Sequence, residues 1–324
     1  MRAVTGPGRW IWGLSGLSTA AVLAVPGVRL ITHAGFDHQH PAPSANLIRK
    51  VSLTQPITSM NVQSADGPVV VTAGSVRSVQ LTEYISYDKT AGPPPAVQDS
   101  VSGGRLTLAD PACAVSSCGV TFAVTVPATT PVSATVTSNG APVSLTGLAG
   151  ANVDSGGAPV TLEHISGPET VGTDGGSLRL NGLTGALHAD TGGGPLFARD
   201  IDGPATITTD GGSLSLDGLT GTLQADSGGG PATALDVTAP TATVITGGGS
   251  GQLTFATAPA TVTFSTDGGP ATLQVPGGPY ALNADSDGGP ESVSIASSAS
   301  APRSLNVASG GGQLSIGAAQ PPAG

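Results

Sequence analysis

Aspartates recur beside glycine pairs in the second half of this 324-residue chain, and they are the first residues whose spacing could support chemistry. One set precedes the Gly-Gly pairs and a second set ends the preceding units: Asp174, Asp210, Asp267 and Asp287, then Asp154, Asp190, Asp226 and Asp285. Stacked carboxylates could bind Ca²⁺, which takes about six to eight oxygen ligands. However, the nonapeptide calcium repeat G-G-x-G-x-D is absent, and aspartate also caps its own turn. We therefore interpret these residues as turn formers and expect no metal site.

The remaining reactive side chains do not form a catalytic set. Asp200 and Asp202 are close enough to suggest a glycosidase pair, but they lie on a predicted corner. The segment 37–40 (Asp-His-Gln-His) could chelate a metal weakly but falls in a predicted linker, and we assign no role to His164 or His188. No Ser-His-Asp or Cys-His arrangement, phosphate loop or dinucleotide fingerprint occurs. We expect no catalytic residue, no cofactor and no enzymatic activity.

The chain has two cysteines, Cys113 and Cys118, with the spacing C-x4-C. A metal site would need two further ligands, and none cluster nearby. Outside the cytoplasm, a disulfide is the default for such a pair, with free thiols as the alternative. We predict a disulfide between Cys113 and Cys118. It would add little to global stability, because the loop that it closes is short.

Composition excludes several protein classes. The net charge is −10, only 10% of residues are charged, and the chain contains 49 Gly and 27 Pro. So many helix breakers argue against a helical bundle or a coiled coil. The acidic balance argues against a nucleic-acid partner, because from residue 138 onward the only basic residues are Arg179, Arg199 and Arg303.

The N-terminal region predicts export. Residues 10–28 carry no charge, Arg2 and Arg9 precede them, and about 17–25 apolar residues span a bilayer. We predict a short cytoplasmic tail over 1–9, a transmembrane anchor or signal segment over 10–31 and a linker over 32–48. A signal peptide cleaved after residues 22–24 (Val-Leu-Ala) remains the alternative. In both cases the bulk of the chain is extracytoplasmic, and an anchor would make it a single-pass protein of the cell membrane.

The rest of the chain predicts an all-β fold. Residues 49–137 contain several runs rich in β-branched residues, such as 121–127, and form a β-rich N-terminal segment. From 138 to 317 the chain repeats: 173–190 and 209–226 are nearly identical, and units of 17–23 residues continue to the end. Residues 318–324 are predicted to be a disordered tail.

One repeat unit contains a Gly-Gly turn, a short alternating strand, a second turn and a second strand. Alternation places Leu180, Leu187, Leu216 and Leu223 on one face, which a single unit cannot bury alone. Stacked units bury that face and pair the backbone. We therefore predict a β-solenoid of about nine coils, preceded by a β-rich capping segment and an N-terminal transmembrane helix. A β-sandwich and a propeller are the alternatives.

These features resemble a bacterial domain-of-unknown-function family, putative adhesins with β-strand repeats, of the membrane-anchored type found in actinobacteria. The resemblance rests on residues 55–62, 122–127 and 138–140 and on the Gly-Leu-Thr-Gly corners at 182–185 and 218–221. It implies a β-solenoid in the cell envelope and carries over no catalytic residue.

The function expected from these observations is that of a membrane-anchored extracytoplasmic surface protein, an adhesin or structural envelope module without catalysis. Its expected partners are the membrane, through the N-terminal helix, and a cell-wall polymer or surface protein. An envelope-stress or signalling accessory protein that contacts a membrane partner is the alternative. A polysaccharide-active enzyme is a third and less favoured one, because paired acids in a cleft are not evident.

Overall fold

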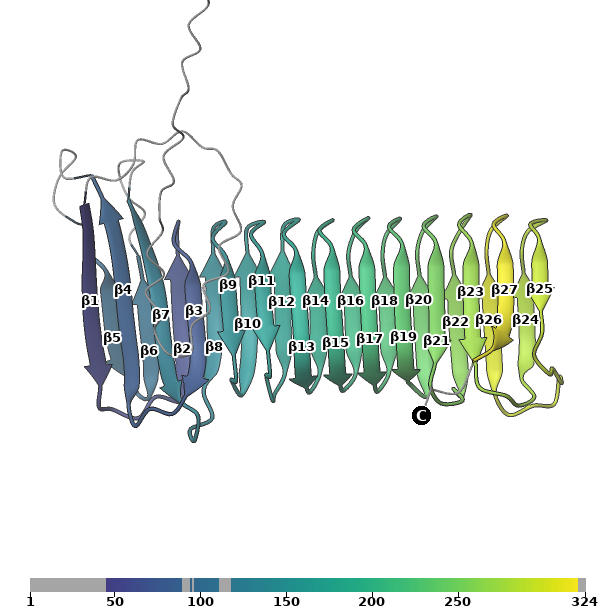
Figure 1. Ribbon diagram of the computed structural model, residues 1–324, viewed down its shortest axis with the longest axis horizontal. Helices are drawn as coiled ribbons and strands as arrows, with labels where there is room; N and C mark the ends of the chain where they lie inside the picture. Colours follow the sequence, from purple (N-terminus) through teal and green to yellow (C-terminus); the bar gives the residue numbers. More distant parts are fainter. Residues whose placement is uncertain (1–44, 89–93, 95, 111–117, 320–324) are drawn as a thin grey trace, which may run out of the picture. The chain divides into compact units, whose positions relative to one another are not determined.

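The computed structural model describes residues 45–88, 94, 96–110 and 118–319. All of its regular elements are strands, 27 in total, divided between two sheets (Figure 1). The part of the chain that the structure describes contains no helix long and apolar enough to cross a bilayer. The predicted membrane segment over 10–31, most of the linker, Cys113 and residues 320–324 lie outside the described residues.

The strands of the 14-stranded sheet follow one another in the order β1 (Ala45–Leu53), β4 (Val79–Tyr87), β7 (Gly119–Pro127), β3 (Val69–Gly74), β9 (Val143–Thr146), β11 (Val160–Glu163), β13 (Leu178–Thr184), β15 (Leu196–Asp202), β17 (Leu214–Thr220), β19 (Ala232–Thr238), β21 (Gly251–Phe255), β23 (Ala271–Val275), β27 (Leu314–Ala318) and β25 (Glu291–Val293).

The strands of the 13-stranded sheet follow the order β24 (Ala281–Asp285), β26 (Ser304–Ala308), β22 (Thr261–Ser265), β20 (Thr241–Ile245), β18 (Leu223–Asp226), β16 (Ala205–Thr208), β14 (Leu187–Asp190), β12 (Glu169–Thr173), β10 (Gly150–Ser155), β8 (Ser133–Ser138), β2 (Ser59–Ser64), β6 (Arg105–Ala109) and β5 (Gln98–Ser102).

Each coil of the chain gives one strand to each sheet, and neighbouring coils pair in parallel. In the 14-stranded sheet, for example, Leu178, Leu196 and Leu214 align across three successive strands. Strands β8 to β27 make ten coils, so the predicted β-solenoid is confirmed, with about ten coils where we expected about nine. The fold follows from the period-2 alternation of the strands, which sends every second side chain into the space between the sheets.

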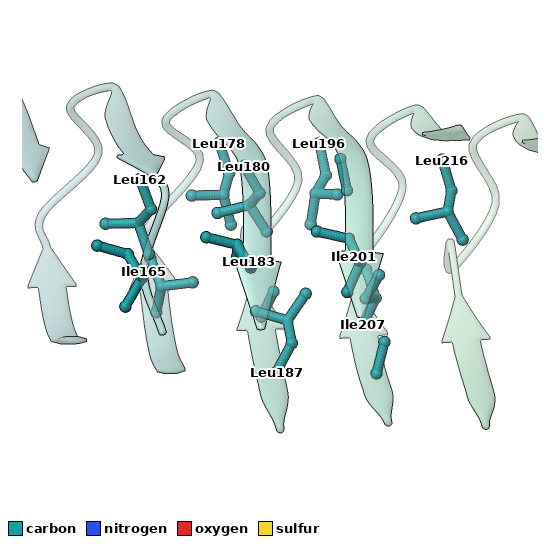
Figure 2. Close-up of a cluster of buried hydrophobic side chains, with 14 of the residues drawn as sticks. Leu162, Ile165, Leu178, Leu180, Leu183, Leu187, Leu196, Ile201, Ile207 and Leu216 are labelled. Atoms are coloured by element: carbon teal, nitrogen blue, oxygen red, sulfur yellow. The ribbon is translucent and has the colours of Figure 1, made fainter. Parts of the chain in front are cut away.

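The interior is mainly aliphatic. Leu180, Leu187, Leu216 and Leu223 are each 3% exposed or less, as their alternation predicts. Figure 2 shows these rows of Leu and Ile side chains stacking from coil to coil between the two sheets. Because all coils contribute to one continuous core, each unit is stable only through its neighbours.

Glycine and a hydroxyl residue define one corner of each coil. Buried Ser or Thr side chains donate a hydrogen bond to the carbonyl three residues later, at 2.5–3.2 Å, in eleven turns from Ser64 to Ser309. We call these residues the hydroxyl row. In nine of these turns the accepting residue is a glycine that packs against a neighbouring coil: a Cβ on Gly194 would lie 2.1 Å from the carbonyl oxygen of Gly176. The other two turns carry Ala141 and Ala158 at this position. Close stacking therefore favours glycine at most of these corners.

The N-terminal segment belongs to the same two sheets. β2 pairs in parallel with β8, and β3 with β9, so both sheets continue across the predicted boundary at 137/138. Only β1, β4 and β5 pair antiparallel with their neighbours. β1 begins at Ala45, earlier than the predicted end of the linker at residue 48, because the full length of β1 pairs with β4.

At both ends of the solenoid the order of the coils differs from the order of the chain. The coil β2–β3 lies inside β6–β7, although it comes first in the sequence. At the other end the last coil, β26–β27, lies between β22–β23 and β24–β25 (Figure 1). Residues 294–303 connect the outermost coil back to this inner position.

Candidate binding site on the outer face of the 14-stranded sheet

The outward side chains of the 14-stranded sheet form two rows that run from coil to coil. The backbone register aligns them as Ser144, Thr161, Arg179, Phe197, Ser215, Thr233, Gln252 and Thr272 in the first row and as Thr146, Glu163, Asn181, Arg199, Asp217 and Leu235 in the second. Most members of the first row are small and polar. Within these two rows, the charged and the large apolar side chains all lie on β11 to β19.

Two contacts organise the centre of this region. The guanidinium carbon of Arg179 lies 5.4 Å from the centroid of the Phe197 ring, a distance at which a cation is attracted to an aromatic face. On the next row, Nη2 of Arg199 donates a hydrogen bond of 2.9 Å to Oδ2 of Asp217, one coil further on. Phe197 is 41% exposed, although a phenyl ring gains most from burial.

These side chains surround a shallow depression of about 390 Å³. Its lining comprises Glu163, Arg179, Leu180, Asn181, Phe197, Ala198, Arg199, Ser215 and Asp217. We call six of these residues, Glu163, Arg179, Asn181, Phe197, Arg199 and Asp217, the outer-face patch.

The scaffold holds the patch rigidly. Each patch residue alternates along its strand with a buried aliphatic neighbour; Leu196 and Ala198, for example, flank Phe197 and point into the core. Strand pairing keeps successive patch residues on adjacent rungs, about 4.8 Å apart. A site carried by paired strands loses little conformational entropy on binding, which favours affinity.

Six of the eight aspartates predicted to form turns do so: Asp210, Asp267 and Asp287 adopt a positive φ, and three others accept a turn hydrogen bond. Asp154 instead lies within β10. Asp190 accepts a hydrogen bond from the backbone of Gly192 (3.0 Å), Asp226 from Gly228 (2.9 Å) and Asp285 from Asp287 (2.9 Å). Within the described ranges, no group of three or more His, Cys, Asp or Glu side chains is placed to hold a metal ion.

The other candidates from the sequence are dispersed. Asp200 and Asp202 lie exposed at the end of β15, where Asp200 adopts a positive φ of 54°. His164 lies at a corner and His188 points outward from β14. Cys118 immediately precedes β7, whereas Cys113 and residues 37–40 lie outside the described part of the chain, so the disulfide stays a prediction.

Two features escaped the sequence analysis. The first is the patch itself: Arg179 and Arg199 were noted as rare cations, but Phe197 was not connected with them. The spacing of one coil, 18 residues from Arg179 to Phe197 and from Arg199 to Asp217, could have revealed that they are neighbours. In a solenoid, residues one repeat apart are in contact.

The second feature is Glu169, at the start of β12. It is 1% exposed, and neither carboxyl oxygen has a hydrogen-bond partner. Desolvation by the aliphatic interior raises the pKa of Glu169 to about 7. The residue stands in register with Ala151 and Leu187, so an apolar side chain is the norm at this position. Comparing the repeats column by column could have found it.

The chain matches no protein-family model, and no curated protein matches it significantly. Among solved structures, it is similar to a putative adhesin from Parabacteroides merdae, with a TM-score of 0.38, 12% identity and coverage of 86% of this chain and 98% of that one. A putative adhesin from Bacteroides fragilis gives a TM-score of 0.35 and 10% identity over 86% and 100% of the two chains. A putative cell adhesion protein from Clostridium sporogenes gives 0.25 and 10% over 85% and 99%.

Proposed function

We propose that this chain is an adhesin-like binding protein of the cell envelope, which holds its ligand on the outer-face patch. The observation that carries this proposal is the clustering of Arg179, Phe197, Arg199 and Asp217 in two rows whose other members are mostly small and polar. An exposed aromatic ring beside charge-paired side chains is typical of recognition surfaces, where Arg and aromatic residues supply most of the binding energy.

Binding accounts for the patch better than catalysis does. Catalytic groups are usually held in a cleft where burial and neighbouring charges shift their pKa values. The patch residues instead stand on an open sheet face, and the side chain of Arg199 is 66% exposed. An open, rigid face suits contact with an extended polymer or another surface.

The proposed location is the outer side of the cell membrane. The uncharged run at 10–28 would anchor the chain, and Arg2 and Arg9 would keep its N-terminus in the cytoplasm. The solenoid would then present the patch to the cell wall or to other cells. In this arrangement the patch is a fixed part of a surface-displayed scaffold.

The test is to express the full chain in a bacterial host and to measure location and adhesion together. We expect the chain to stay with membranes after an alkaline wash, to be cleaved by protease added to intact cells or spheroplasts, and to increase adhesion to wall-polymer-coated surfaces. The Phe197→Ser variant should lose the adhesion. Leu235→Thr is the matched control, because Leu235 is similarly exposed (37%) on the same face and lies outside the depression.

Three results would count against the proposal. Protection from protease in both cells and spheroplasts would contradict the location. Equal adhesion by the Phe197→Ser variant would contradict the role of the patch. A change in an envelope-stress reporter without any adhesion would favour the signalling alternative instead.

A further inference from the structure

We infer that the outer-face patch binds a neutral, hydroxyl-rich saccharide. This inference rests on the proposed binding function and goes further by naming the chemical class of the ligand. Three features of the patch support a saccharide: the accessible side of the aromatic ring, the hydrogen-bond donors and acceptors around it, and the sign of the surrounding charge.

The Phe197 ring has one covered side and one open side. In the register of the sheet, its neighbours on the two adjacent strands are Arg179 on β13 and Ser215 on β17. The guanidinium of Arg179 lies over the ring. Ser215 carries only a short hydroxymethyl group, which cannot cover a phenyl ring, and it lines the depression. A flat ligand with an apolar C–H face, such as a pyranose ring, can therefore pack against Phe197 beside Ser215.

The polar groups around the ring suit hydroxyls. Arginine only donates hydrogen bonds, ionised carboxylates only accept them, and an amide does both. The patch contains two arginines, two acids and Asn181, all within one depression. Neighbouring hydroxyls of a sugar donate and accept at once, so they can bridge the exposed Arg199–Asp217 pair without leaving either charge unpaired.

The charges disfavour ionic polymers. The two arginines and the two acids of the patch cancel, so the patch offers no net charge to a polyanion or a polycation. The chain as a whole carries −10, and Asp200 and Asp202 lie one and three residues after Arg199 on the exposed corner. A polyanion would meet repulsion there, whereas a polycation would have to approach Arg179 and Arg199.

The experiment is calorimetric titration of the purified full chain, in detergent micelles, with three classes of oligosaccharide of equal length. The neutral probes are cello-, laminari- and xylohexaose; the acidic probe is hexagalacturonate and the cationic probe is chitosan hexamer. We expect at least one neutral probe to bind, with an affinity that changes little between low and high salt, because no net charge is neutralised. The ionic probes should bind at least about tenfold more weakly.

Variants assign the binding to the patch. Phe197→Ser should weaken binding of the neutral probe at least about tenfold, as for a central aromatic anchor. Arg199→Ser should weaken it as well, and Leu235→Thr should leave it unchanged. Circular dichroism and thermal unfolding of each variant check that the fold is intact.

Several outcomes would overturn the inference. Preferential, salt-sensitive binding of the acidic probe through the same residues would do so, and it would leave the proposed adhesin function standing. Loss of cell adhesion by Phe197→Ser without binding of any saccharide would point to a protein ligand and would also overturn it. Neutral binding that survives Phe197→Ser would show that the sugar lies elsewhere.

Discussion

The regular middle of the solenoid and its two ends bury the same continuous core with different orders of the coils. Between β8 and β23, coils follow one another in chain order, with one register shift between β19 and β21. At each end, one coil is inserted out of order: β2–β3 lies inside β6–β7, and the last coil, β26–β27, lies inside β24–β25. The middle is held by repetition, whereas the ends are held by interleaving. The C-terminal end cannot unravel simply from the terminus inward, because the terminal coil lies between two others.

The two ends also differ in how they close the core. At the N-terminal end, Arg49 on β1 binds Glu83 on β4 (3.0 Å) and Asp99 on β5 (2.9 Å), which ties the edges of both sheets together. Glu83 is fully buried on β4, one strand in from the edge strand β1. Its partner Arg49 places an inward-pointing charge on that edge strand, which discourages further strand addition. At the C-terminal end, the buried Tyr280 closes the connection to the outermost coil and donates a hydrogen bond to the carbonyl of Pro276 (2.7 Å).

The largest expected effect comes from removing the interleaved coil. Deletion of residues 304–324 removes β26 and β27, the partners of β24 and β25. We expect residues 281–293 to lose all hydrogen-exchange protection, although they are retained in the chain. Deletion of 320–324 alone is the control and should change nothing in that region. Retained protection at 281–293 would show that the outermost coil can move inward, and that interleaving is not needed.

The regular middle should be most sensitive at the stacking glycines. Gly194→Ala would place a methyl group 2.1 Å from the carbonyl oxygen of Gly176, so adjacent coils must separate. We expect a loss of about 2–4 kcal/mol in the free energy of unfolding, measured by denaturant titration. Gly172→Ala, where a Cβ meets nothing within 4 Å, is the matched control. If both substitutions lowered the free energy of unfolding equally, the close contact of Gly194 with the neighbouring coil would not explain the loss.

Glu169 interrupts the aliphatic interior of the middle, and replacing it should stabilise the protein. The pKa of its carboxyl is about 7 in the folded chain, above the ordinary value of 4.5, so the folded state holds the proton more tightly. Wild-type stability should therefore fall between about pH 4.5 and pH 7 and remain lower above that, by about 3 kcal/mol. Glu169→Leu should be more stable than wild type at pH 8 by about this amount.

The contribution of ionisation can be separated from that of added apolar volume. Glu169→Gln keeps the shape but cannot ionise, so its advantage over wild type should be present at pH 8 and vanish at pH 4. Denaturant unfolding of wild type, Glu169→Leu and Glu169→Gln between pH 4 and pH 8 measures their differences in the free energy of unfolding. The other acidic residues contribute equally to all three proteins, so their contributions cancel in these differences. If the free energies of unfolding of wild type and Glu169→Gln changed with pH in the same way, the burial of an ionisable carboxyl at this position would be contradicted.

The smallest expected effect concerns the hydroxyl row. Thr209 donates a hydrogen bond of 2.8 Å to the carbonyl of Gly212 from a fully buried position. Thr209→Val removes the donor at nearly constant volume, and we expect a loss of about 1 kcal/mol in the free energy of unfolding. The exposed Thr220 on the same coil provides the control, since Thr220→Val should be neutral. If the two variants are equally stable, the hydrogen bonds of the hydroxyl row contribute little to the free energy of unfolding.

Much of the middle could be predicted from the sequence because its determinants are local. Alternation along each strand decides which of Leu180 and Arg179 faces the core, and a glycine pair decides where the chain turns. A unit of about 18 residues with one apolar face must stack on its neighbours to bury that face. The sequence by itself therefore determined the all-β class, the repeat frame and the aliphatic interior.

Only the tertiary structure decided the order of the coils at the ends, the joining of 45–127 to the same sheets and the assembly of the outer-face patch. Each depends on pairing between strands far apart in the chain, such as β22 with β26, where Thr261 aligns with Ser304. A strand's alternation specifies a buried face but does not name its neighbour, because any free parallel edge offers the same backbone hydrogen bonds. Which edge is free depends on the whole fold.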